Sequence, residues 1–219
     1  MSSLVEAAKN IQFFKDGSLK HRLSNLENSF VGADKQTSQA SCATENISSV
    51  LLDSAFVLKQ AAGQINVVVH AIGILLSLPH LLKENEVIES LSLGAGNTGK
   101  SFDLETNLRV AEYKFIQWKG GSEAIRQNSI FKDFYMLAEA NTLKERYLYV
   151  LDLTYPLKFF SGGRTLNSVM SRNNKLWTDF QKQYDTRFSK VHEYYEYRKS
   201  LVQMVDILDV VPEIADLFS

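Results

Sequence analysis

The sequence predicts an α/β protein in which a small mixed sheet is flanked by helices, with further helices at both ends of the chain. Two patterns lead to this prediction. The stretch INVVVHAIGILLSL, residues 65–78, is apolar almost all round, as expected of a helix packed against a sheet. Extended segments, an amphipathic helix and a strongly apolar strand then follow one another along the chain.

The composition is that of a globular protein. Of the 219 residues, 45% are hydrophobic and 22% are charged, and the net charge is −1, so any contact with nucleic acid requires a local basic patch. Cys42 is the only cysteine, which excludes an internal disulfide and a cysteine-based zinc site. The N-terminus lacks the features of a secretory signal, and residues 65–78 are fewer than the roughly 20 needed to cross a bilayer. We therefore expect a cytoplasmic protein without membrane association.

Two parts are expected along the chain. Residues 1–45 are predicted to form an N-terminal helical segment and a polar linker, because residues 31–46 are small and polar without hydrophobic periodicity. Residues 46–219 are predicted to form a single α/β domain with C-terminal helices. Its first helix is expected to end at Gly63, and the apolar helix that follows is expected to stop at Pro79.

The remaining elements follow from periodicity and turn residues. Three strands are predicted at 86–94, 102–105 and 108–118, then a helix from Glu123 to about Ala140 and a strand at 146–155. From Leu166 to about Asp209 the pattern is helical. The alternation within the third strand assigns two faces: one with Val110, Glu112, Lys114 and Ile116, and the other with Ala111, Tyr113 and Phe115.

Two carboxylates and a lysine fall close together on the predicted hairpin. Glu112 and Lys114 are two positions apart on one strand, so both side chains leave the same face. The turn at Thr106 and Asn107 folds the preceding strand back and brings Asp103 near the same edge. Two carboxylates can hold Mg²⁺ or Mn²⁺ beside a phosphodiester, while a lysine orients water or stabilises developing charge. The spacing therefore predicts a compact acid–acid–lysine cluster.

A competing motif lies just before this cluster. Residues 94–101, GAGNTGKS, fit the Walker A pattern, in which a lysine and a hydroxyl, here Lys100 and Ser101, hold the phosphates and Mg²⁺ of a nucleotide. That chemistry requires the loop to lead directly into a helix N-terminus. Aromatic and β-branched residues follow Ser101 and favour a hairpin, so a P-loop nucleotide-binding protein is the third alternative.

The order helix, three strands, helix, strand, with an aspartate before an E-x-K triplet, resembles the core of the PD-(D/E)XK, or restriction-endonuclease-like, nucleases. The matching stretch runs from about Gln64 to Thr154 and contains FDLETNLRVAEYKF. The resemblance implies a restriction-endonuclease-like core in which Asp103 and Glu112 bind Mg²⁺ or Mn²⁺ and Lys114 is the catalytic lysine. Some branches of the family also place a glutamine on the next helix, which Gln127 matches.

One departure from the family leaves two interpretations open. The family often has a glutamate on its first core helix, and residues 64–82 contain no acid. The chain is therefore either an active Mg²⁺-dependent nuclease or an inactive nuclease-like module that binds protein or nucleic acid. His70, inside the apolar stretch, is interpreted as a core histidine. Glu105, two residues beyond Asp103, is a further candidate for the metal site.

The predicted partner is DNA, with RNA as the alternative substrate. Lys119 and Arg126 flank a Gly-Gly turn at the start of the helix beside the cluster, which indicates contact with substrate phosphates. Aromatic and basic residues also mix along residues 173–199, but interleaved acids weaken any positive field there. This second stretch is predicted to be an amphipathic helix packed on the domain, or a homodimer contact.

Overall fold

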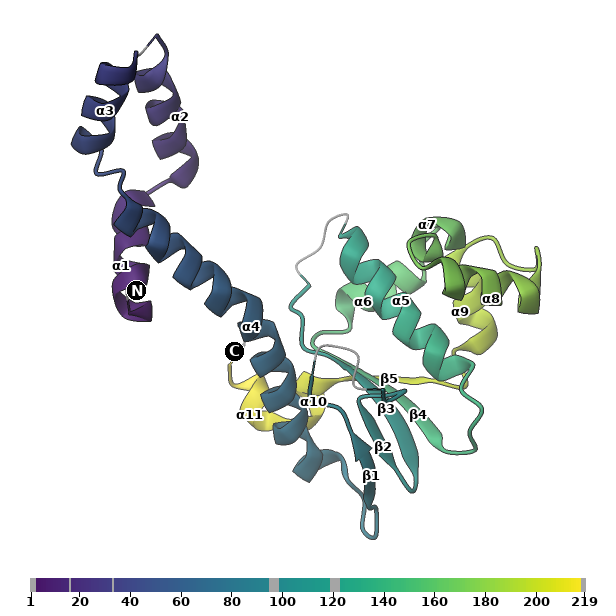
Figure 1. The fold of residues 1–219 in the computed structure, drawn as a ribbon. Helices are drawn as coiled ribbons and strands as arrows, with labels where there is room; N and C mark the ends of the chain where they lie inside the picture. Colours follow the sequence, from purple (N-terminus) through teal and green to yellow (C-terminus); the bar gives the residue numbers. More distant parts are fainter. Residues whose placement is uncertain (1–2, 16, 33, 95–98, 119–122, 218–219) are drawn as a thin grey trace. The chain divides into compact units, whose positions relative to one another are not determined.

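The structure is a computed structural model that describes residues 3–15, 17–32, 34–94, 99–118 and 123–217. The chain divides into two compact units, Met1–Asn66 and Val67–Ser219 (Figure 1). The boundary between them falls within the longest helix, α4 (Ser49–Leu81).

The first unit is helical, with α1 (Leu4–Lys15), α2 (Leu19–Phe30), α3 (Lys35–Thr44) and the beginning of α4. The prediction of a polar linker at residues 31–46 is wrong, because α3 occupies most of that stretch. Asp34 begins this helix: its side chain accepts a hydrogen bond from the Thr37 N–H at 2.8 Å. N-caps of this kind compensate for the absence of a hydrophobic face.

Helix α4 runs without interruption through Gly63, where the sequence predicted a break. A glycine inside a helix costs about 1 kcal/mol, which a long helix absorbs because propagation is favourable on both sides. By length and composition alone this helix is long and apolar enough to cross a membrane, and 22% of its most apolar stretch is buried in the protein. Its C-terminal part packs into a protein core through Ile74 and Leu78.

The second unit is built on a five-stranded mixed sheet in the order β1-β2-β3-β4-β5. The strands are β1 (Ile88–Leu91), β2 (Leu104–Thr106), β3 (Arg109–Lys114), β4 (Glu145–Val150) and β5 (Gln203–Asp206). Strands β1, β2 and β3 are antiparallel neighbours, whereas β3, β4 and β5 are parallel. The strand β5 lies in a stretch predicted to be helical. Four residues carry too little periodicity to indicate a strand, and pairing with β4 determines its conformation.

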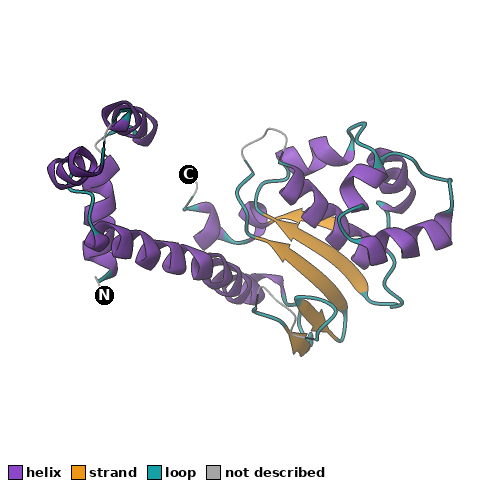
Figure 2. Cartoon of the chain, turned by 45° about the horizontal axis from the view of Figure 1, so that its top comes forward, coloured by secondary structure: helices purple, strands orange, loops and turns teal. Residues whose placement is uncertain are grey.

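Helices cover both faces of this sheet (Figure 2). They are α5 (Ala124–Ala138), α6 (Thr154–Phe160), α7 (Leu166–Met170), α8 (Asn174–Tyr184), α9 (Val191–Arg198), α10 (Ile207–Val210) and α11 (Pro212–Ala215). Val110 belongs to a core with Phe131 and Phe134 of α5, whereas Ala111 and Tyr113 belong to a second core with Ile74 of α4. The two predicted faces of β3 are confirmed in this respect, as is the mixed α/β class.

A buried ion pair fixes the β2–β3 hairpin. The Arg109 guanidinium donates to both carboxylate oxygens of Glu86, each at 2.6 Å, and also to the Tyr149 hydroxyl at 2.8 Å. Thr106, at the turn, donates to Glu86 at 2.7 Å. Such a bidentate pair needs its full set of hydrogen bonds to offset desolvation, and here these hydrogen bonds fix the register of the hairpin.

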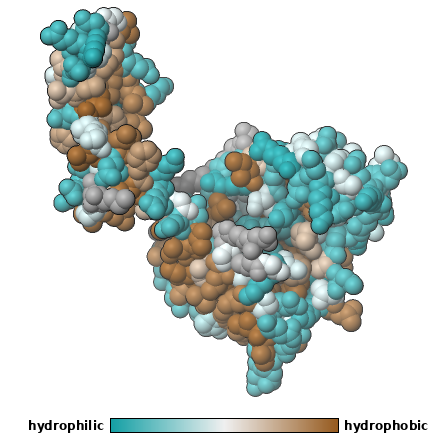
Figure 3. Space-filling view, viewed as in Figure 1, coloured by the Kyte–Doolittle hydropathy of each residue, from teal (hydrophilic) through white to brown (hydrophobic). Residues whose placement is uncertain are grey.

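Hydrophobic side chains also reach the surface of both units (Figure 3).

Candidate active site

The β2–β3 hairpin places Asp103 and Glu112 side by side. Leu104 pairs with Ala111, and Asp103 precedes Leu104 at a bend, close enough to Glu112 for its charge to raise the pKa of that residue. A carboxylate oxygen of Asp103 accepts a hydrogen bond from the Tyr113 N–H at 3.0 Å, which fastens the aspartate to the end of β3. The hairpin therefore brings the two predicted acids together from adjacent strand segments.

Helix α4 supplies a third group. His70 Nε2 lies 3.3 Å from Asp103 Oδ1, and both side chains are mostly buried. Burial on its own raises the pKa of Asp103, but hydrogen bonds from His70 and from the Tyr113 N–H, together with the charges of His70 and Lys114, outweigh it and lower this pKa below its ordinary value. Asp103 is thus held as a carboxylate.

Helix α5 supplies a fourth group, Asp133, which pairs with Lys114 of β3. Lys114 Nζ lies 2.5 Å from Asp133 Oδ2, and the Asp133 side chain is only 9% exposed. Burial lowers the pKa of a lysine, but the charges of Asp133, Glu112 and Asp103 outweigh it here and raise the pKa of Lys114. The amine is therefore favoured as a cation, surrounded by the carboxyl groups of Asp133, Glu112 and Asp103.

The surroundings of Glu112 strongly affect its pKa. Burial and the nearby charges of Asp133 and Asp103 raise its pKa to about 9, against an opposing effect of Lys114. A carboxyl group whose pKa is raised by burial and by neighbouring carboxylates marks a place where one more positive charge is favourable. The protein alone does not supply that charge.

A divalent cation fits this deficit in charge and in donor type. Mg²⁺ binds proteins through one or two carboxylates and completes its coordination with water and substrate oxygens. Asp103 and Glu112 supply two such carboxylates. In the part of the chain that the structure describes, no group of three or more His, Cys, Asp or Glu side chains is arranged to hold a metal ion. The fit is to an ion that retains most of its water.

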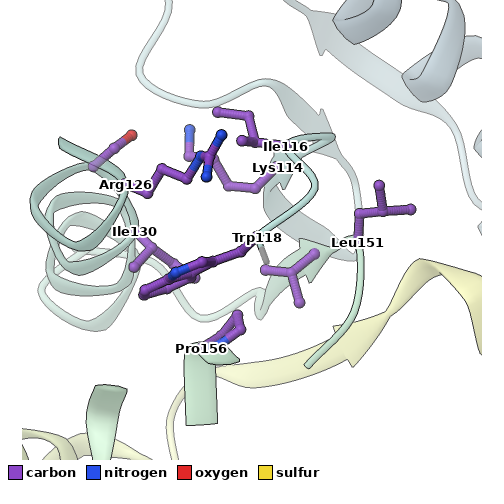
Figure 4. A pocket seen from close by; sticks show the side chains of 9 residues that line it. Lys114, Ile116, Trp118, Arg126, Ile130, Leu151 and Pro156 are labelled. Atoms are coloured by element: carbon purple, nitrogen blue, oxygen red, sulfur yellow. The ribbon is translucent and has the colours of Figure 1, made fainter. Parts of the chain in front are cut away.

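A hollow opens beside Lys114, at the carboxyl ends of the parallel strands β3 and β4 (Figure 4). Its volume is about 340 Å³ including the open mouth. Arg126, from the first turn of α5, lines it together with Lys114 and forms an ion pair with Glu123. Of the two predicted phosphate contacts, Arg126 thus lies near the cluster, and Lys119 lies outside the described residues.

Three other candidates have different partners. Gln127 accepts a hydrogen bond from Arg164. Glu105 pairs with Lys144, whose Nζ lies 2.9 Å from its carboxylate, so it does not join Asp103 as the sequence suggested. Lys100 of the Walker-like stretch donates to the Leu91 carbonyl. The residues after Ser101 lead into the β2–β3 hairpin and not into a helix, so the helix N-terminus that a P-loop requires is missing there.

Sequence reasoning missed two members of the cluster. His70 was interpreted as a core histidine, but it contacts the predicted metal ligand. Asp133 was not singled out, although a signal for it exists. It falls between Ile130 and Leu137 on the buried face of α5, and an aspartate on such a face requires a cationic partner.

Comparison of the chain with family models, with curated proteins and with solved structures finds no match to any of them. The geometry of the cluster is therefore the basis for assigning a function.

Proposed function

We propose that this protein is a Mg²⁺-dependent nuclease that hydrolyses phosphodiester bonds of DNA, with RNA as the alternative substrate and Mn²⁺ as an alternative ion. The observation that carries the proposal is the proximity of the Asp103 and Glu112 carboxyl groups at the end of the hairpin, with the Lys114 amine beside them. The raised pKa of Glu112, which comes from burial and then from the charges of Asp133 and Asp103, supports it, because a bound cation would stabilise the ionised carboxylate.

The order of elements supports the same proposal. An apolar helix, three antiparallel strands, a helix and a parallel strand follow each other here, and helices cover both faces of the sheet. This arrangement agrees with the restriction-endonuclease-like core that the sequence resemblance implies, and we propose that core as the finer description of the fold.

Each side chain of the cluster has a proposed task. Asp103 and Glu112 would hold the ion, which when bound neutralises charge on the phosphate and acidifies a water molecule. His70 orients Asp103 from α4, and Asp133 orients Lys114 from α5. Lys114 places its ammonium group where negative charge develops on the phosphate, and Arg126 lies close enough along the hollow to bind an adjoining phosphate.

One observation favours a second candidate, a nuclease-like module that binds nucleic acid without cutting it. Lys114 is engaged by Asp133 at 2.5 Å, and the first core helix contributes a histidine in place of the family's acid. Both features reduce the negative charge available to an ion, because Lys114 compensates the charge of Asp133 and a histidine stands where the family has an acid. Binding through Lys114 and Arg126 would persist in such a module.

Cleavage assays with matched variants test the proposal. Single- and double-stranded DNA and RNA are incubated with the protein in Mg²⁺, Mn²⁺ or EDTA. We expect cleavage in Mg²⁺, none in EDTA, and a loss of about a hundredfold or more in Glu112→Gln and Lys114→Ala. Glu105→Gln is the control, because it makes the same change on the adjacent strand outside the cluster.

Three results would overturn this proposal. Cleavage that survives both EDTA and Glu112→Gln would assign the activity to another site or another protein. Binding of DNA with no cleavage under any of these conditions would establish the second candidate. Tight binding of ATP or GTP that Lys100→Ala abolishes would establish the nucleotide-binding alternative.

A further inference from the structure

The hollow beside Lys114 has a mostly apolar wall and two basic side chains. Most of its wall is apolar and comes from the ends of β3 and β4, from α5 and from α6, including Ile116, Trp118, Ile130 and Pro156. The nitrogens of Lys114 and Arg126 lie together on one side, whereas Trp118 and Pro156 lie on the other (Figure 4). An occupant would therefore combine an apolar body with an anionic group attached to it.

The apolar wall of the hollow is well packed. Trp118 is 6% exposed, and its ring packs against Tyr155 and Phe159 with centroid distances of 6.3 and 6.1 Å. The Leu151 N–H donates to the Lys114 carbonyl at 3.0 Å, which continues the pairing of β3 with β4 along the floor of the hollow. A preformed apolar wall binds flat groups without the entropic cost of ordering side chains.

We propose that the hollow receives one nucleobase of the substrate, from the nucleotide adjoining the phosphate that is cut. This inference rests on the proposed nuclease function and names its substrate class. A nucleotide combines a flat apolar body with an attached phosphate, which matches the apolar wall and the Lys114–Arg126 pair. Because Lys114 belongs both to the acid cluster and to the wall of the hollow, the base lies next to the scissile phosphate.

The consequence is a preference for unpaired strands. A base inside a duplex is covered on both flat faces by its neighbours and must be unstacked and unpaired before it enters a pocket. That cost is smallest for single-stranded nucleic acid and for frayed ends. The protein should therefore cut single-stranded DNA in preference to an intact duplex.

Cleavage of defined oligonucleotides tests this inference. The substrates are a single-stranded DNA of fixed sequence, its blunt duplex, and a set of single strands with one abasic nucleotide moved stepwise past the principal cut. We expect the single strand to be cut at least about tenfold faster than the duplex, and one abasic position next to the cut to slow cleavage about tenfold.

Ser129→Leu provides the matched variant. Ser129 lines the hollow from α5 but does not belong to the acid cluster, so a larger side chain fills the space and leaves the cluster in place. We expect it to cut intact and abasic strands at the same rate. Ser171→Leu, the same change at an exposed position after α7, should retain the wild-type difference, and thermal unfolding verifies that both variants fold.

The results distinguish the two proposals. Equal cleavage of single strand and duplex, or no effect of an abasic nucleotide at any position, overturns the nucleobase pocket and leaves the nuclease function standing. If the wild type cuts none of these substrates, the nuclease function fails. The pocket is then tested by binding, with fluorescence anisotropy of the intact and abasic strands, and equal affinity for the two overturns it.

Discussion

The amine of Lys114 and the carboxylate of Asp133 meet at 2.5 Å between the end of β3 and the middle of α5. Both groups are largely buried, and neither is adjacent to the other in sequence. The pair joins the strand that carries the candidate active site to the helix that covers it. Its two members consequently affect the stability of the fold and the protonation of the site together.

Asp133→Asn separates these two effects. Removing one partner of a buried pair leaves the other uncompensated, so we expect the free energy of unfolding to fall by about 3 kcal/mol. The same change withdraws the largest influence that raises the pKa of Lys114, so the alkaline limb of the pH–rate profile should move to lower pH. Urea unfolding and cleavage rates between pH 6 and about 10 measure the two effects.

Asp179→Asn is the control for that variant, because Asp179 is exposed on α8. It should change neither quantity. An Asp133→Asn protein with a lower stability but an unchanged pH–rate profile would show that Asp133 supports the fold without influencing Lys114.

Glu112→Gln is expected to stabilise the protein at neutral and alkaline pH while it abolishes activity. The folded-state pKa of Glu112, about 9, lies above the ordinary value of 4.5. Below pH 4.5 the group is protonated in both states, and between 4.5 and 9 the unfolded chain loses its proton while the folded chain keeps it. Stability therefore falls as pH rises through this window.

The glutamine variant lacks this titration. At pH 8 we expect it to be more stable than the wild type, on the order of 2 kcal/mol, with a difference that vanishes towards pH 4.5. Urea unfolding at several pH values measures it, and Glu105→Gln should follow the wild-type curve. A glutamine variant whose stability declines with pH as steeply as the wild type would show that Glu112 is ionised in the folded protein.

Divalent cations should raise the melting temperature of the wild type. An ion at a hundred times its dissociation constant stabilises the folded state by about 2.7 kcal/mol, which corresponds to roughly 5–10 °C for a domain of this size. The shift should be lost in Asp103→Asn and Glu112→Gln and retained in Glu89→Gln, whose carboxylate pairs with Lys144. Equal shifts in all four proteins would place the binding of the ion elsewhere. Differential scanning fluorimetry with Mg²⁺, Mn²⁺ and EDTA provides the comparison.

Gly73 and Gly63 of α4 should respond in opposite ways to alanine. A Cβ at Gly73 would lie 2.6 Å from the Phe115 ring, whereas one at Gly63 would have nothing within 4 Å. We expect Gly73→Ala to cost about 1–3 kcal/mol by overpacking, and Gly63→Ala to stabilise by about 0.5–1 kcal/mol through helix propensity.

The clash at Gly73 should also reach the active site. His70 lies one helical turn before it and packs edge-on against the same Phe115 ring, with centroids 6.2 Å apart. Displacing α4 would therefore withdraw His70 from Asp103 and lower the cleavage rate. Chemical denaturation measures both variants, and full activity in a destabilised Gly73→Ala protein would show that His70 has no part in the reaction.

The part of the site that could be predicted from the sequence is the part that one hairpin determines. Asp103, Glu112 and Lys114 are placed by strand alternation and a single turn, both of which are local. His70 and Asp133 come from helices on opposite faces of the sheet. The apolar stretch of α4 has no clear polar side, so its periodicity does not reveal that His70 faces Asp103. The periodicity of α5 indicates that Asp133 is buried, but its pairing with Lys114 depends on packing between distant segments.

The same reasoning explains which elements of the fold were mispredicted. The strands β3 and β4 have enough alternating or continuous apolar residues to be recognised alone, and the turn residues Thr106 and Asn107 mark the short β2 beside β3. The strand β5 is short, and its hydrogen bonds to β4 come from a segment more than fifty residues away. The break predicted at Gly63 was wrong because a local propensity was outweighed by the helix on either side of it.

Because β5 pairs with β4, a segment near the C-terminus forms part of the central sheet. The Asp206 carboxylate accepts hydrogen bonds from the Asp152 and Leu153 N–H groups at 3.1 and 2.9 Å, where β4 leads into α6. A shortened version lacking this segment would release the turn from which Leu151 and Pro156 project into the hollow. Extensions for purification or imaging are therefore better placed at the amino terminus, and the part of the chain that carries the candidate active site cannot be excised by cutting after α9.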